Sequence, residues 1–145
     1  MDADPKIPEH EWQQIVDLLY DIEDAITDDD LNAHSEFLFD LHCLLDKLEQ
    51  QYGALAMLSA IRADCCQDAD EQIQLYEKTL SLAEQQNDPI ALIQSLESLC
   101  ECYAEKGNHD KAESFYKQLM LAVSRYGDEF LCSTLEELES MINSQ

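Results

Sequence analysis

Glycine and proline are scarce in this chain, with three residues of each among 145. So few turn-forming residues argue against a turn-rich β fold, which depends on them. Three glycines could also hardly build a phosphate-binding loop, and the G-x-S-x-G and H-E-x-x-H motifs are absent. We therefore expect a protein that has no catalytic residues, binds no cofactor and is not an enzyme.

Basic residues are the second scarcity. Eight Lys and Arg stand against 32 Asp and Glu, which gives a formal net charge of -24. A surface this negative repels nucleic acid and anionic membranes and attracts basic proteins. The plain alternative is that the acidity only keeps the protein in solution.

Long apolar runs and metal-ligand spacings are missing as well. No stretch approaches the roughly 20 apolar residues of a membrane span, and the polar, acidic start lacks the pattern of a signal peptide. The six Cys form no C-x-x-C pair and fall mostly on apolar helix faces, as buried reduced thiols do. The run Asp28-Asp29-Asp30 lacks the alternating ligands of a calcium loop. We predict a cytoplasmic protein without a metal site.

Apolar residues recur at helical intervals along most of the chain. The first helix is predicted from Pro8 to about residue 27, with its stripe at Trp12, Ile15, Leu19, Ile22 and Ile26. The second runs to Tyr52, and Phe37, Phe39 and Leu44 widen its stripe of leucines, so we expect it to be packed on more than one side. Four further helices are predicted over about 54–66, 69–87, 89–106 and 109–126, and a seventh over about 128–142. Aspartates at the joins are expected to cap them.

The stretch from Leu96 to Val123 carries the most specific pattern. Tyr103, Gly107, Ala112 and Tyr116 are spaced Tyr-x3-Gly-x4-Ala-x3-Tyr, which predicts a helical hairpin with a glycine stop and a small residue at the close approach. In this the chain resembles the tetratricopeptide-repeat family. Similar joins recur at Gly53, near Asn87 and at Gly127, at intervals longer than the family's usual repeat.

The resemblance implies an all-α fold, a right-handed α-α superhelix of about seven helices. We expect one domain over 1–145, made of an acidic helical pair (8–52), tetratricopeptide-like hairpins (53–126) and a carboxyl-terminal capping helix (127–145). A compact, irregular helical bundle is the alternative.

The acids of the first hairpin form the first candidate partner-binding surface. No Lys or Arg occurs between Lys6 and Lys47, whereas acids recur throughout that span, mainly off the apolar stripes. The residues that we assign to this surface are Asp21, Asp24, Asp28, Asp29 and Asp30. Their mutual repulsion costs stability, and a cationic partner would relieve it.

The resemblance implies a second surface, because repeats of this family bind a peptide or protein segment along the inner face of the superhelix. On the matched hairpin its positions would be Gln94, Glu97, Glu101 and Glu105, which step by 3, 4 and 4. Aligned joins add Ser59 and Arg62 on the third helix, and Ser133 and Glu136 on the last.

Charge and size together favour a non-catalytic module that binds and neutralises a basic protein, in its most concrete form an immunity protein or inhibitor of a toxin such as a nuclease. The alternative is an adaptor or secretion chaperone that holds an extended peptide in the inner groove. A weaker third candidate is a nucleic-acid mimic that sequesters a nucleic-acid-binding protein. No direct binding of nucleic acid or membrane is expected, and a homodimer could form through Trp12 or the last helix.

Overall fold

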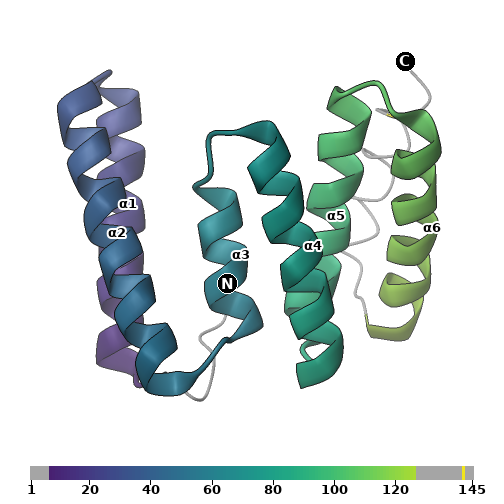
Figure 1. Cartoon of the computed structure of the whole chain (residues 1–145), viewed down its shortest axis with the longest axis horizontal. Helices are drawn as coiled ribbons and strands as arrows, with labels where there is room; N and C mark the ends of the chain where they lie inside the picture. The colour runs from purple at the N-terminus through teal and green to yellow at the C-terminus, as the bar shows by residue number, and fades with distance from the viewer. Residues whose placement is uncertain (1–6, 127–141, 143–145) are drawn as a thin grey trace. The chain divides into compact units, whose positions relative to one another are not determined.

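The structure is a computed structural model, and it describes residues 7–126 and residue 142. Within these residues the chain forms six α-helices and no strand (Figure 1). The helices are α1 (Glu9–Thr27), α2 (Leu31–Tyr52), α3 (Ala56–Asp64), α4 (Ala69–Gln86), α5 (Pro89–Glu105) and α6 (His109–Tyr126). The all-α prediction is confirmed, and the first six predicted helices lie close to the observed ones. The seventh, over 128–142, and the capping segment 127–145 lie outside the described residues, apart from Ile142.

The chain divides into two compact units, residues 1–58 and residues 59–145. The border falls inside α3, a few residues after the predicted border between the acidic helical pair and the hairpins. The single-domain organisation stays a prediction.

The amino-terminal unit contains the hairpin of α1 and α2, which pack against each other. Each helix has apolar residues at helical spacing: the buried residues of α1 are Trp12, Ile15, Ile22 and Ala25, and those of α2 are Leu41, Leu45 and Leu48. At the open end of the hairpin, the Tyr52 hydroxyl donates a hydrogen bond of 2.5 Å to the Glu11 carboxylate. This bond fixes the end of α2 beside the start of α1.

Two predictions for this hairpin are wrong. Ile26, placed in the apolar stripe of α1, is 59% exposed, and Phe39, expected to widen the packed face of α2, is 68% exposed. Every residue of α2 before Leu41 is at least partly exposed. The amino-terminal half of α2 is therefore not packed on several sides.

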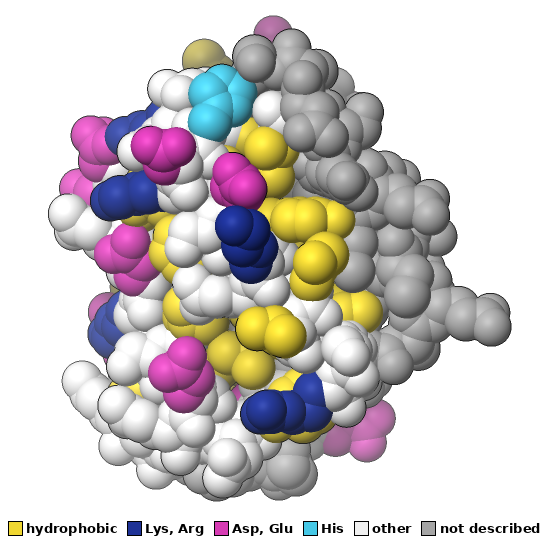
Figure 2. All heavy atoms as spheres, turned by 90° about the vertical axis from the view of Figure 1, so that its right-hand side faces the viewer, with side chains coloured by type: hydrophobic (Ala, Val, Ile, Leu, Met, Phe, Trp, Pro, Cys, Tyr) yellow, Lys and Arg dark blue, Asp and Glu magenta, His cyan; other side chains and the backbone are white. Residues whose placement is uncertain are grey.

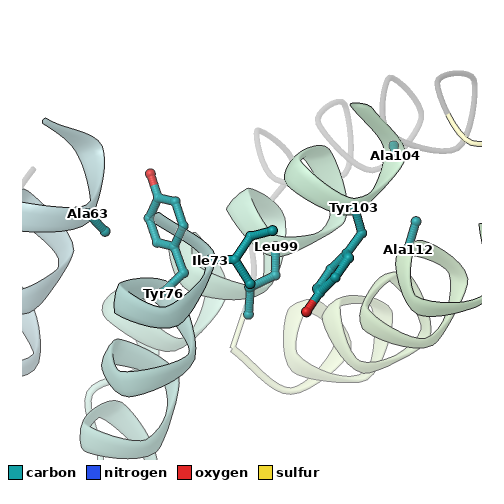
Figure 3. Close-up of a cluster of buried hydrophobic side chains, with 7 residues drawn as sticks. All are labelled: Ala63, Ile73, Tyr76, Leu99, Tyr103, Ala104 and Ala112. Atoms are coloured by element: carbon teal, nitrogen blue, oxygen red, sulfur yellow. The ribbon is translucent and has the colours of Figure 1, made fainter. Parts of the chain in front are cut away.

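The carboxyl-terminal unit is built around α5, which packs against α4 on one side and α6 on the other. The α5 helix is apolar on most of its circumference, and its buried residues include Leu96, Leu99, Cys100 and Tyr103. One cluster of buried side chains joins α3, α4, α5 and α6 through Ala63, Ile73, Tyr76, Leu99, Tyr103, Ala104 and Ala112 (Figure 3). A second cluster, around Leu96 and Leu119, holds α5 and α6 together. Burial on two sides explains why α5 carries so few exposed positions.

The α5–α6 hairpin has the features that its sequence pattern predicted. Gly107 has φ of 78°, which a residue with a side chain rarely adopts. The Lys111 amide donates a 3.2 Å hydrogen bond to the Asn108 side chain, so Asn108 caps α6. Ala112 is fully buried, and the Tyr103 and Phe115 rings stack with centroids 5.7 Å apart. The small residue at position 112 thus stands where the two helices approach closely.

Aspartate caps begin three of the helices, as the sequence indicated. Asp30, Asp68 and Asp88 each accept a hydrogen bond from the backbone amide three residues ahead, at 3.1, 2.9 and 3.1 Å. Each cap satisfies one amide that the helix itself cannot and places a negative charge at its positive end. These local bonds set where α2, α4 and α5 start.

Candidate functional site

A row of aspartates runs along the exposed side of α1. Asp17, Asp21, Asp24 and Asp28 step by 4, 3 and 4 residues, so they lie on one side of the helix, and all four are exposed. Trp12, Ile15 and Ile22 are buried on the other side. The periodicity of α1 therefore separates a core face from a continuous acidic face.

The turn between α1 and α2 extends this row with two further aspartates. Asp29 adopts φ of 55°, in the left-handed region that Asp tolerates better than most residues. The Asp30 carboxylate accepts the hydrogen bond that caps α2. Asp28 and Asp29 are exposed and have no side-chain partner among the described residues. Asp21 and Asp24 on α1 thus lie toward the same end of the hairpin as Asp28, Asp29 and Asp30 in the turn.

The position of this row is unfavourable for the folded protein. Asp24 lies in the last turn of α1 and Asp28 caps its end, where the helix dipole is negative and a cation would be favoured; no basic residue is there. Like charges three and four residues apart on a helix repel by a few tenths of a kcal/mol per pair. Among the described residues, Asp21, Asp24 and Asp28 form no ion pair that offsets these costs.

An aromatic side chain stands within the acidic row. Tyr20 is 63% exposed and lies three residues after Asp17 and four before Asp24, so it is their neighbour on the helix surface. An exposed ring between carboxylates can take a lysine or arginine through both charge and cation–π attraction. Sequence reasoning missed Tyr20, although its helical spacing from these aspartates was a signal that could have found it.

The second predicted surface is less open than the first. On α5, Gln94, Glu97 and Glu101 are partly buried and only Glu105 is exposed. Arg62 on α3 is also partly buried, and Glu97, Glu101 and Arg62 all interact with other residues. Ser133 and Glu136 lie outside the described residues.

Ser59 was expected on that surface, and this prediction is wrong. It is 2% exposed, and its hydroxyl is hydrogen-bonded to that of Thr79 on α4. The alignment of joins put Ser59 level with Gln94 but could not show that α4 covers it.

Polar side chains also meet between α3 and α4. The Tyr76 hydroxyl donates to the Asp64 carboxylate at 2.6 Å, and the Gln72 side-chain amide donates to the Ala63 carbonyl at 3.0 Å. Desolvation raises the pKa of Asp64, and the bond from Tyr76 opposes that shift; desolvation and the same bond raise the pKa of Tyr76. The Tyr76 phenol therefore stays protonated at neutral pH and ties the end of α3 to α4.

The cysteines differ more in exposure than their sequence positions indicated. Cys100 is fully buried, and desolvation, with the charges of Glu101 and Glu97, raises the pKa of its thiol to about 12. Burial and Asp64 raise the pKa of Cys65 to about 11. Cys43, in contrast, is exposed on α2, so the expectation of burial is wrong for it. The raised values keep Cys65 and Cys100 in the thiol form, which is a poor nucleophile.

The part of the chain that the structure describes contains neither a candidate metal site nor a helix that could cross a membrane. No three His, Cys, Asp or Glu side chains among residues 7–126 and 142 are grouped so that they could hold a metal ion. None of the six described helices combines the length and the apolar character needed to cross a bilayer.

Comparison with known proteins gave no match: no protein-family model, no curated protein and no solved structure is significantly similar to this chain. The acidic face of α1 and the turn after it are called the acidic row. This surface consists of Asp17, Tyr20, Asp21, Asp24, Asp28 and Asp29.

Proposed function

We propose that this protein is a non-catalytic, acidic binding module that binds and neutralises a basic partner protein. In its most concrete form it is a cytoplasmic immunity protein or inhibitor of a toxin such as a nuclease. The observation that carries the proposal is the acidic row: exposed like charges on one side of α1, continued to its carboxyl-terminal end, where the helix dipole disfavours them and the last turn contains no basic residue.

The energetics support a surface maintained for binding. Repulsion along the row and at the end of α1 weakens the folded state, and solubility alone does not require charges at those positions. A basic partner would relieve this repulsion on binding, and the relief would add to the binding free energy. Electrostatic attraction would also accelerate encounter, as a toxin inhibitor requires.

A nuclease is the partner class that suits this surface best. A nuclease attracts phosphate, so its active cleft is positively charged. A row of carboxylates on a rigid helix can occupy such a cleft in place of the phosphates. Tyr20 adds a flat ring that can stack on an arginine or a base-binding aromatic side chain.

Capture from the native source at low salt, with neutralised variants, tests the proposal. The first variant carries Asp21→Asn, Asp24→Asn and Asp28→Asn. The control carries Glu84→Gln, Asp110→Asn and Glu113→Gln, which removes the same charge from exposed positions of the other unit. We expect a basic protein that wild type and control retain, that the first variant loses and that salt releases. Retention by the first variant would overturn the proposal.

A tetratricopeptide-like adaptor or secretion chaperone is the second candidate. It is supported by the α5–α6 hairpin, in which Tyr103 and Ala112 are buried and Gly107 has φ of 78°. A right-handed superhelix of such hairpins would hold an extended peptide over Glu97, Glu101 and Glu105. The substitutions Glu101→Lys and Glu105→Lys would then abolish peptide binding. The variant with three neutralised aspartates on and after α1 would still bind the peptide.

A further inference from the structure

The amino-terminal half of α2 carries an apolar stripe that nothing in the described chain covers. Leu31 is 73% exposed and Phe39 is 68% exposed. They are eight residues apart with Ser35 between them, so all three lie on one side of the helix over about 12 Å. Ser35, Glu36, Phe39 and Asp40 line an open hollow of about 350 Å³. We call Leu31, Ser35 and Phe39 the α2 stripe.

Negative charge surrounds this stripe. Asp28, Asp29 and Asp30 directly precede Leu31, and Glu36 and Asp40 lie beside Phe39 on the helix; apart from the capping Asp30, none has a side-chain partner among the described residues. Large exposed apolar side chains cost solubility, and they mark binding surfaces when polar groups rim them. The charged side chains of this rim are all negative.

A second exposed apolar region, on α6, is different in charge. On the α6 side of the molecule, hydrophobic side chains lie among both basic and acidic ones (Figure 2). Met120 and Leu121 are exposed there, near Lys117 and Arg125. Helical spacing predicts that Met120 belongs to the apolar stripe of α6 with Ala112, Leu119 and Val123. Met120 is 44% exposed, so this prediction is wrong for it, whereas the other three are buried. Mixed charge does not select a partner, whereas the uniformly negative rim of the α2 stripe does.

Charge decides which occupant fits the α2 stripe. A second copy of this chain would bring another acidic rim against the first, at a net charge of -24 per chain. A peptide that binds by strand addition needs an exposed sheet edge, and the described residues contain no strand. A helix that has apolar side chains four residues apart and lysine or arginine beside them matches both the stripe and its rim.

We infer that the α2 stripe is the docking site for a cationic amphipathic helix of the partner, whose apolar side chains contact Leu31 and Phe39 while its basic side chains meet Asp28, Asp29, Glu36 and Asp40. This inference rests on the proposed function, because it takes the partner to be basic. It adds that apolar contacts, and not charge alone, provide the specificity.

Two synthetic peptides and the full chain test it. The first is a lysine–leucine peptide of about 18 residues, some five turns, whose leucines form one helical stripe. The second has the same composition in an order without a stripe. We expect the first to bind at least about tenfold more tightly, and Phe39→Ala or Leu31→Ala to remove that preference. Leu121→Ala is the matched control, because Leu121 is as exposed as Leu31, at 73%.

Each other outcome overturns the inference. Equal binding of the two peptides would leave charge as the sole determinant, which the proposed function survives. No binding of either peptide at low salt would exclude the stripe as a helix site, while the capture experiment with the α1 variants still decides the proposed function separately. Self-association that Phe39→Ala abolishes would assign the stripe to a second copy. Because Leu31 and Phe39 are exposed, unchanged urea midpoints will show that the variants fold.

Discussion

The hydroxyl groups of Ser59 and Thr79 lie 2.7 Å apart in a hydrogen bond that joins α3 to α4. Both residues are buried, at 2% and 0% exposure. The Thr79 hydroxyl also lies 2.8 Å from the Leu75 carbonyl oxygen. A buried hydroxyl that loses its partner keeps its desolvation cost, so this pair should behave as one unit.

Thr79→Val should therefore destabilise the protein by about 1–3 kcal/mol, because it leaves the Ser59 hydroxyl buried without its partner. Ser59→Ala should cost a similar amount. The double variant should cost less than the sum of the two by about 1 kcal/mol, since no hydroxyl is then stranded. Urea unfolding of all four proteins measures this coupling, and strict additivity would show that the hydroxyls do not interact.

Tyr76 should make stability depend on pH in the alkaline range. Desolvation, the hydrogen bond to Asp64 and the charge of Asp64 raise its pKa above the ordinary value of 10.0. The native state therefore keeps the phenol proton where the unfolded chain loses it. The stabilisation is complete below pH 10 and is lost as pH rises beyond it.

Tyr76→Phe should reduce this alkaline loss, measured as the fall in urea midpoint between neutral pH and about pH 10.5. Some loss will remain, because the pKa values of Tyr52 and Tyr103 are raised too. Tyr20→Phe is the matched control, since it removes an exposed phenol in place of one that is hydrogen-bonded to Asp64. An unchanged slope in Tyr76→Phe would contradict the assignment.

Two glycines should differ in what an added methyl group costs. Gly53 caps α2 with φ of 90° and ψ of -179°, a region essentially restricted to glycine, and Gly107 has φ of 78°. No atom lies within 4 Å of a Cβ placed at either position, so the cost is conformational.

We expect Gly53→Ala to destabilise by about 1–3 kcal/mol and Gly107→Ala by about 1 kcal/mol. Gly107→Asn should recover part of its loss, because asparagine tolerates the left-handed region. Thermal and urea unfolding will rank the three variants. A smaller loss for Gly53→Ala than for Gly107→Ala would contradict the order given by the backbone angles.

Thiol reactivity should separate Cys43 from Cys100. A disulfide reagent at about pH 8 attacks the thiolate, and burial both shields Cys100 and raises its pKa to about 12. Cys43→Ser should remove one fast-reacting thiol from the folded protein, because Cys43 is exposed.

Cys100→Ser should leave the fast phase intact and remove one thiol only after unfolding in urea. Loss of a fast-reacting thiol in Cys100→Ser would mean that the α5–α6 interface opens on the time scale of the reaction.

Much of the helical structure follows from local sequence. Asp30, Asp68 and Asp88 begin helices because a carboxylate can accept a hydrogen bond from the backbone amide three residues ahead. Gly53 ends α2 and Gly107 follows the end of α5, because glycine adopts the required backbone angles at low cost. These signals depend on neighbours in the chain, so they can be read without the fold. The aspartates of the acidic row were predictable for the same reason, since helical spacing and the absence of Lys and Arg are properties of the sequence.

Tertiary packing decided which of the periodic residues are covered. Ile26, Phe39 and Met120 share the spacing of core residues yet are exposed, and Ser59 has the spacing of a surface residue yet is buried under α4. Periodicity shows which side chains share a face of a helix, but a face becomes core only where another helix lies on it. By itself, the sequence determined an all-helical chain with one strongly acidic hairpin. Only the packed structure showed that this hairpin also exposes Leu31 and Phe39, because burial depends on contacts between helices distant in the chain.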